Sequence, residues 1–180
     1  MKKITLILLF LSLSLFAEKI QKVKEVEKTQ KSEKTEKTQK PEKMVLKTIK
    51  NEFIIVNNDK GNLTFVNKKY HRKNVVLYLF GSTCAFCQKK VPAIKKLMKH
   101  KNVQIIGIHS HKNIGDKALK AYAKKVGFTF DILSFKNDIK MLNFLREIGV
   151  WLGGIPFTIL VDEDGNVFEV DISNIDEELE

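Results

Sequence analysis

Residues 74–92, NVVLYLFGSTCAFCQKKVP, contain both cysteines of the chain, Cys84 and Cys87. The apolar, β-branched run at 75–80 predicts a strand buried on both faces, and residues 81–83 predict a turn after it. A helix is expected next, capped by Ser82 or Thr83, which places Cys84 among free backbone N–H groups at the positive end of the helix dipole. A thiolate is stabilised there, so the pattern indicates a nucleophilic Cys84, with Cys87 beneath the first turn.

Two other uses of a C-x-x-C pair compete with this interpretation. A closed structural zinc site needs four ligands, and the sequence contains no second C-x-x-C and no H-x3-H to complete one. A purely structural disulfide would close a loop so short that it removes little entropy from the unfolded chain. The strand before the pair and the helix after it favour a redox-active dithiol.

Residues 1–17, MKKITLILLFLSLSLFA, begin with two lysines after the initiator and continue with an apolar run at 4–16. The run is short for a membrane span and has the length of a secretory signal peptide. Cleavage after Ala17 is expected, and because Leu15 is bulkier than the small residue usual there, an uncleaved N-terminal anchor stays open. Export to the periplasm or a similar oxidising compartment would hold a lone cysteine pair as a disulfide unless a partner reduces it.

Composition separates a linker from a folded domain. Residues 18–43 repeat Glu, Lys and Thr with few apolar side chains, which predicts a charged, disordered linker, whereas residues 44–180 form the expected domain. Within the domain, residues 44–126 carry 18 basic and three acidic side chains, and residues 127–180 carry three basic and 12 acidic ones. The sequence has no nucleic-acid fold signature, so we expect no nucleic-acid partner; acidic proteins and anionic lipid headgroups stay open as partners of the basic half.

Hydrophobic periodicity predicts strands that alternate with helices. The predicted strands are 52–56, 63–66, 75–80, 103–108, 157–161 and 167–170, with a short extended piece at 128–132; the predicted helices follow Cys84 and span 116–126 and 138–148. The helix after Cys84 contains Pro92, which removes a backbone donor, so a kink is expected there. This order predicts an α/β fold, a three-layer sandwich whose mixed central sheet is flanked by helices, with an N-terminal hairpin.

Three features resemble one known family: Cys84-Ala85-Phe86-Cys87 after a buried strand, Pro92 eight residues beyond Cys84, and Gly153-Gly154-Ile155-Pro156 before the last hairpin. Together they are similar to the thioredoxin fold, and more narrowly to the exported thiol–disulfide oxidoreductases of the TlpA and ResA type. The resemblance covers about residues 50–172. It implies that Cys84 attacks a partner disulfide, that Cys87 resolves the mixed disulfide, and that a cis Pro156 faces the cysteines, without an organic cofactor.

The resemblance also implies protein substrates that carry thiols or disulfides, and a membrane partner that passes electrons to the domain. It further implies that the domain is a monomer. The residues expected to contact the substrate are Thr83, Phe86, Ile155 and Pro156. A physical argument supports the role of the proline. A cis X–Pro bond costs only about 0.5–1 kcal/mol more than a trans one and lacks a backbone donor, so a partner strand can pair with the exposed backbone of Ile155. A trans proline at the start of an edge strand is the alternative.

The chain departs from the family at positions that set the redox chemistry. Thr83 stands in place of the tryptophan before the first cysteine, Tyr78 in place of the buried acid of thioredoxin, and Lys90 in place of the glutamate of TlpA-type and ResA-type proteins. No carboxylate is therefore expected at these positions beside the sulfurs, and Tyr78 and Lys90 are the candidates for tuning the thiol pKa. A lysine favours the thiolate, which makes the disulfide more oxidising.

The direction of electron flow has two candidates. The family favours reduction, as in cytochrome c maturation or the protection of cysteines, and the missing carboxylates leave a disulfide-introducing oxidant as the alternative. A copper-binding chaperone of the same fold is a further alternative, since His109 and His111 end a strand near the cysteines and a Cys/Cys/His cluster suits Cu(I). Two histidines in a lysine-rich loop are more often surface residues, so no metal is assigned.

Overall fold

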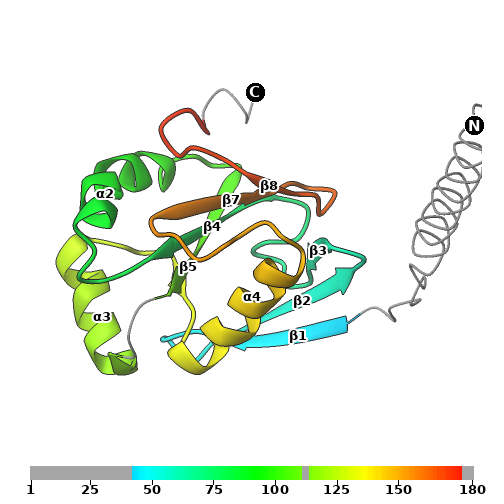
Figure 1. Ribbon diagram of the computed structural model, residues 1–180, viewed down its shortest axis with the longest axis horizontal. Helices are drawn as coiled ribbons and strands as arrows, with labels where there is room; N and C mark the ends of the chain where they lie inside the picture. Colours follow the sequence, from blue (N-terminus) through cyan, green and yellow to red (C-terminus); the bar gives the residue numbers. More distant parts are fainter. Residues whose placement is uncertain (1–41, 111–113, 176–180) are drawn as a thin grey trace, which may run out of the picture. The chain divides into compact units, whose positions relative to one another are not determined.

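The computed structural model describes residues 42–110 and 114–175 (Figure 1). The predicted signal peptide or anchor at 1–17 and nearly all of the predicted linker lie outside the described residues. The strands are β1 Glu42–Lys47, β2 Phe53–Asp59, β3 Asn62–Phe65, β4 Asn74–Phe80, β5 Val103–His109, β6 Asp131–Ile132, β7 Phe157–Val161 and β8 Val167–Glu169. The helices are α2 Ala85–Leu97, α3 Gly115–Val126 and α4 Phe135–Glu147. In the described ranges, no helix has the length and apolar character needed to cross a membrane.

A five-stranded mixed sheet forms the centre of the domain, in the order β6-β5-β4-β7-β8. β4 pairs in parallel with β5 and antiparallel with β7, and β5 pairs in parallel with β6. β4 takes the middle position because its side chains are apolar on both faces, and every residue from Val75 to Phe80 is buried. The helices pack on this mixed sheet, which confirms the predicted α/β fold.

The two faces of β4 belong to different cores. Val75, Leu77 and Leu79 pack with residues of β1, β2, β3 and α4. The residues that alternate with them, Val76, Tyr78 and Phe80, pack with α2 and α3. Figure 1 shows α2 and α3 on one side of the sheet and α4 beside β1 and β2 on the other. The period of two along a single strand therefore sets the three layers of the fold.

Three antiparallel strands, β1, β2 and β3, form a second sheet where the sequence predicts a hairpin. β2 and β3 make the predicted hairpin, and β1 adds a strand that begins at Glu42, inside the predicted linker at 18–43. Met44 and Leu46 of β1 are buried while Val45 between them is exposed, which is the alternation of a half-buried strand. An edge strand can direct charged side chains into water, and the charged residues at the start of β1 do so. They make the strand alternation difficult to recognise in the sequence.

A buried carboxylate links β6 to segments next to the second sheet. Asp131 accepts hydrogen bonds from Lys50 at 3.0 Å, from Lys69 at 2.6 Å and from the hydroxyl of Tyr70, and it is 2% exposed. Burial raises the pKa of this carboxyl, but the hydrogen bonds from Lys69, Tyr70 and Lys50 outweigh burial and hold the pKa below its usual value. The ionised carboxylate therefore ties the loops after β1 and β3 to the central sheet.

Candidate active site

The two cysteines follow the C-terminal end of β4. The Cys84 N–H donates to the Gly81 carbonyl at 3.1 Å, and this tight turn leads directly into α2. Cys84 itself is the N-terminal cap of α2, so the prediction that Ser82 or Thr83 caps the helix is wrong. The Cys84 sulfur accepts a hydrogen bond from the Cys87 N–H at 3.1 Å, where a serine or threonine oxygen usually accepts. A free N–H group at the helix start is thus directed at sulfur.

Cys84 and Cys87 form a disulfide, with their Cα atoms 5.2 Å apart. The two residues differ in exposure, because Cys84 is half-buried and Cys87 is fully buried. The Gly81 N–H donates to the Cys87 sulfur at 3.5 Å. Each sulfur therefore has one backbone donor, and after reduction such donors stabilise negative charge on sulfur.

The loop before β7 meets the disulfide. The Ile155–Pro156 peptide bond is cis, which is the isomer that the family resemblance implies. The carbonyl oxygen of Ile155 lies 4.0 Å from the Cys84 sulfur, although the two residues are 71 positions apart in the chain. Ile155 and Pro156 are both half-buried, so part of each remains open to solvent beside the sulfur. A molecule that reaches Cys84 can therefore contact this loop.

Trp151 supports the same loop and was not among the site residues that the sequence suggests. Its side chain is 2% exposed, and its Nε1 donates to the Gly154 carbonyl at 2.7 Å, one residue before Ile155. The Arg146 guanidinium lies over the ring, 4.7 Å from the centroid. The signal available in the sequence was that the only tryptophan of the chain stands two residues before Gly153-Gly154.

Two large apolar side chains are exposed on the segments that meet at the disulfide. Phe86, between the cysteines, is 69% exposed, and Leu152, three residues before Ile155, is 90% exposed. The Lys89 ammonium lies 5.5 Å from the centroid of the Phe86 ring, and Thr83 is also exposed. Phe86 thus exposes apolar surface two residues from Cys84, and Leu152 exposes it three residues from Ile155.

Tyr78 lies beneath the start of α2, at the position of the acid in thioredoxin. Its hydroxyl donates to the Cys87 carbonyl at 3.2 Å, and its ring stacks on Phe80 with centroids 5.4 Å apart. Burial, and to a smaller extent Tyr122, raises the pKa of Tyr78 above its usual value. The hydroxyl therefore stays neutral and directs its hydrogen to the backbone, so it anchors the helix start and is unsuited to accept a proton.

Lys90 extends toward the segment after β8. Its ammonium lies 3.1 Å from the Asp171 carboxylate and 2.8 Å from the Ser173 hydroxyl. Hydrogen bonds from the Ser173 backbone and from Lys90 lower the pKa of Asp171. The negative charge of the carboxylate offsets part of the positive charge of Lys90. Lys90 therefore stabilises a thiolate less than an unpaired ammonium would.

His109, one of the two candidate metal ligands, is 1% exposed at the end of β5. Its Nε2 accepts from the Ser82 N–H at 3.1 Å and lies 3.3 Å from the Ser82 hydroxyl. This bond occupies the lone pair that a metal ion would need. His111 lies outside the described residues. Among the residues that are described, no three His, Cys, Asp or Glu side chains are placed to hold a metal ion.

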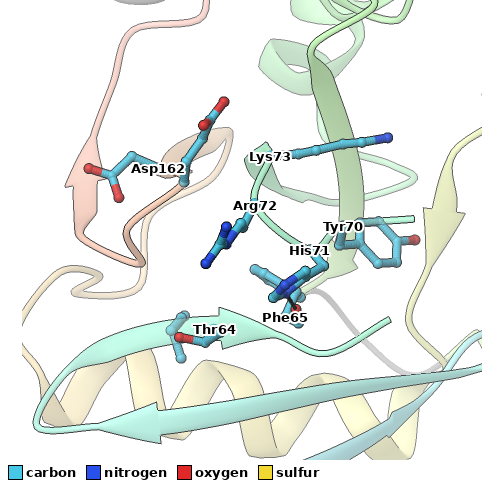
Figure 2. A pocket seen from close by; sticks show the side chains of 9 residues that line it. Thr64, Phe65, Tyr70, His71, Arg72, Lys73 and Asp162 are labelled. Carbon is cyan, nitrogen blue, oxygen red and sulfur yellow. Dashed lines mark hydrogen bonds between the residues drawn. The ribbon is translucent and has the colours of Figure 1, made fainter. Parts of the chain in front are cut away.

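A separate pocket of about 210 Å³ lies between β3, the loop before β4 and the turn after β7. Figure 2 shows Arg72 and His71 directed toward its interior, with Asp162 on the facing wall. The pocket borders the N-terminal end of β4, whereas the cysteines follow the C-terminal end of that strand. It is lined by Leu63, Thr64, Phe65, Tyr70, His71, Arg72, Lys73, Asp162 and Glu163. With no cysteine in its lining, this pocket is separate from the disulfide.

Comparison with known families and proteins agrees with this geometry. The Redoxin family matches residues 47–179. The thiol–disulfide oxidoreductase ResA of Geobacillus kaustophilus (strain HTA426) is 28% identical over 106 residues, which cover 56% of this chain and 55% of the relative. ResA of Bacillus anthracis is 30% identical over 101 residues, covering 54% of this chain and 53% of that protein. The chain thus matches about half the length of these curated relatives.

Solved structures agree on the fold. StoA from Bacillus subtilis superimposes with a TM-score of 0.52 at 19% identity and covers 78% of this chain and 98% of its own. The dsbF protein of MTB, solved in mixed oxidised and reduced forms, gives a TM-score of 0.54 at 20% identity, covering 76% of this chain and 92% of its own. At this level of identity the two structures support the thioredoxin-like fold.

Proposed function

This chain belongs to the Redoxin family, and on that premise we propose that it is a thiol–disulfide oxidoreductase that exchanges disulfides with protein substrates through Cys84 and Cys87. The observation that carries the proposal is the position of Cys84. This half-buried sulfur caps α2, accepts the Cys87 N–H and lies 4.0 Å from the carbonyl of Ile155. It combines access, stabilisation of a thiolate and a neighbouring backbone for substrate contact.

The reaction in the reducing direction has two steps. The Cys84 thiolate attacks one sulfur of a substrate disulfide, forms a mixed disulfide and releases the other substrate sulfur as a thiolate, which takes up a proton. The Cys87 thiolate then attacks the Cys84 sulfur, forms the Cys84–Cys87 disulfide and releases the second substrate thiol. The substrate gains two electrons and the protein loses two, so the disulfide form described here is the product state. A dithiol partner must then reduce it.

Backbone donors assist both steps. The Cys87 N–H lowers the energy of a charge on the Cys84 sulfur, which favours the attacking thiolate. The Gly81 N–H does the same for Cys87, which is buried and protected from competing reactions. Because both donors belong to the backbone, neither donor is itself a titrating group.

The substrates are proposed to be proteins with an extended segment that carries the disulfide. Ile155 presents backbone beside the sulfur, where a substrate strand can form hydrogen bonds. Phe86 and Leu152 supply exposed apolar surface on the two segments that meet there, and Thr83 and Pro156 border it. This arrangement binds backbone and apolar side chains with little demand for a particular sequence, which suits an enzyme with several clients.

We assign the reducing direction, which the resemblance to the TlpA and ResA type implies, and propose export with a membrane electron donor. Residues 1–17 would serve as the signal or anchor. A disulfide-introducing oxidant is the second candidate. One observation favours it: the two positions at which the family carries a carboxylate hold the neutral Tyr78 and Lys90, whose charge is paired with Asp171. The reduction potential decides between them, because a value well below about −200 mV makes a reductant and a value near −120 mV an oxidant.

Trapping of substrates tests the assignment of the two sulfurs. Cys87→Ser leaves the mixed disulfide unresolved, so it accumulates dithiothreitol-sensitive adducts with client proteins, whereas Cys84→Ser forms none. The purified protein is expected to reduce insulin in the presence of dithiothreitol, and both variants lose this activity. If alkylating reagents fail to modify Cys84 in the reduced protein at neutral pH, the proposed function is wrong.

A further inference from the structure

Helices α2 and α3, together with the turn after α2, present a lysine-rich surface. Both helices pack on the same face of the central sheet, and lysines occupy about half of their exposed positions. Between residues 85 and 126 the only acidic residue is Asp116. We call this surface the lysine face; its exposed members are Lys89, Lys95, Lys96, Lys99, Lys101, Lys117, Lys120, Lys124 and Lys125.

The two helices make one continuous surface. The Lys95 side chain reaches across to the end of α3, where a Cβ added to Gly127 would lie 3.2 Å from the Lys95 ammonium. Buried residues of both helices, Ile94 and Leu97 from α2 and Leu119 from α3, share one core. Figure 1 shows α2 and α3 on the same side of the sheet. The positive charge therefore extends over two neighbouring helices and is not confined to one.

The spacing of these lysines carries an energetic cost. Lys120 and Lys124 stand four residues apart on α3, a spacing at which like charges repel each other along a helix, and Lys95 at the end of α2 is followed by Lys99 in the turn after that helix. None of these four lysines forms an ion pair with another described residue. An anionic partner that covers the face would relieve the repulsion.

We propose that the lysine face docks on the anionic phospholipid headgroups of a membrane. Charges spread over two helices match an extended surface of many anions better than a single ligand, and point-like ammonium groups suit headgroup phosphates. An uncleaved anchor at residues 1–17, which the sequence leaves open, would hold the domain beside such a surface. Cys84 caps α2, so docking holds the disulfide close to the bilayer, where membrane-bound thiol partners are met.

Lysine footprinting on vesicles tests this proposal with the full chain. The protein is mixed with vesicles of phosphatidylcholine alone or with added phosphatidylglycerol, acetylated briefly and analysed by mass spectrometry. On the anionic vesicles, acetylation of Lys120 and Lys124 is expected to slow about fivefold, while the exposed Lys136 and Lys140 of α4, on the opposite side of the sheet, react at an unchanged rate. High salt should remove the protection, because mobile ions screen the headgroup charge.

Charge reversal supplies the matched control. Lys120→Glu with Lys124→Glu should abolish the protection of Lys117 and Lys125, whereas Lys136→Glu with Lys140→Glu changes the net charge equally and should leave it intact. Insulin reduction in solution should be the same for both variants. If anionic vesicles change the acetylation rates of the α3 and α4 lysines equally, the proposal is overturned and an acidic protein becomes the partner of the lysine face. Protection that persists in high salt, or that occurs on phosphatidylcholine alone, would also overturn the proposal.

Discussion

The Nε2 atom of His109 accepts a hydrogen bond from the Ser82 N–H at 3.1 Å. His109 ends β5 and Ser82 follows β4, and because these strands are parallel, both residues lie at the same edge of the sheet. The bond fixes the turn in which the neighbouring Gly81 N–H is directed at the Cys87 sulfur, 3.5 Å away. His109 is therefore a positioning residue for the disulfide, and at 1% exposed it is not the surface histidine that its lysine-rich sequence context favoured.

His109→Phe should make the disulfide a weaker oxidant. The variant leaves the Ser82 N–H without its acceptor and loosens the donor to Cys87, so the reduced form loses stability by about 1 kcal/mol and the reduction potential falls by about 20 mV. Equilibration with glutathione buffers measures this shift. Ser82→Ala keeps the backbone bond and should leave the potential unchanged; a potential that is equal in wild type and His109→Phe would contradict the positioning role.

Tyr78→Phe should lower stability without changing redox behaviour. The variant removes the hydrogen bond to the Cys87 carbonyl but retains the ring that stacks on Phe80, so the free energy of unfolding should decrease by about 1 kcal/mol. Because the hydroxyl is bound to a carbonyl and stays neutral, the reduction potential and the pH profile of alkylation should match those of the wild type. Urea unfolding and iodoacetamide kinetics measure the two effects. A shifted alkylation profile would show that Tyr78 acts on the thiols directly.

Lys90→Glu tests both partners of this lysine. It places a carboxylate three residues after Cys87, which should slow alkylation of reduced Cys84 at neutral pH, since a negative neighbour disfavours the thiolate. It also sets two carboxylates against each other at Asp171, so amide exchange should increase in residues 170–175. The ion pair is largely exposed, so global stability should change by less than about 1 kcal/mol. Asp171→Asn should reproduce the exchange but not the slower alkylation.

Asp131→Asn should remove an acid-sensitive contribution to stability. The pKa of Asp131 in the folded protein is below its usual value. Its carboxylate therefore contributes its full stabilisation at pH values above the unfolded pKa of about 3.9. This contribution is lost as the pH falls through the pKa of the folded state. The variant should lose about 2–3 kcal/mol at neutral pH and less in acid. Glu147→Gln, at an exposed carboxylate, should leave the curve of stability against pH unchanged. Parallel curves for Asp131→Asn and wild type would refute this account.

Local patterns were sufficient to predict the centre of the fold. A run of six apolar residues that ends at a glycine favours an interior strand buried on two faces, and the segment after the cysteines has the spacing of an amphipathic helix. Both expectations agree with β4 and α2. The cap prediction failed because serine and threonine are the usual cap residues, whereas here the Cys84 sulfur accepts the N–H at the helix start. The edge strand β1 escaped notice because its first residues are charged.

The sequence by itself determined the pair of sulfurs, the strand that carries them and the class of chemistry, since each depends on residues within about one helical turn or along one strand. Only the tertiary structure decided which groups surround the sulfurs. The bond between Ser82 and His109 and the pairing of Lys90 with Asp171 join segments dozens of residues apart, whereas the place of Ile155 beside Cys84 was implied by the family resemblance. Their approach is set by strand order and register in the sheet, and a linear pattern does not encode the pairing of distant strands.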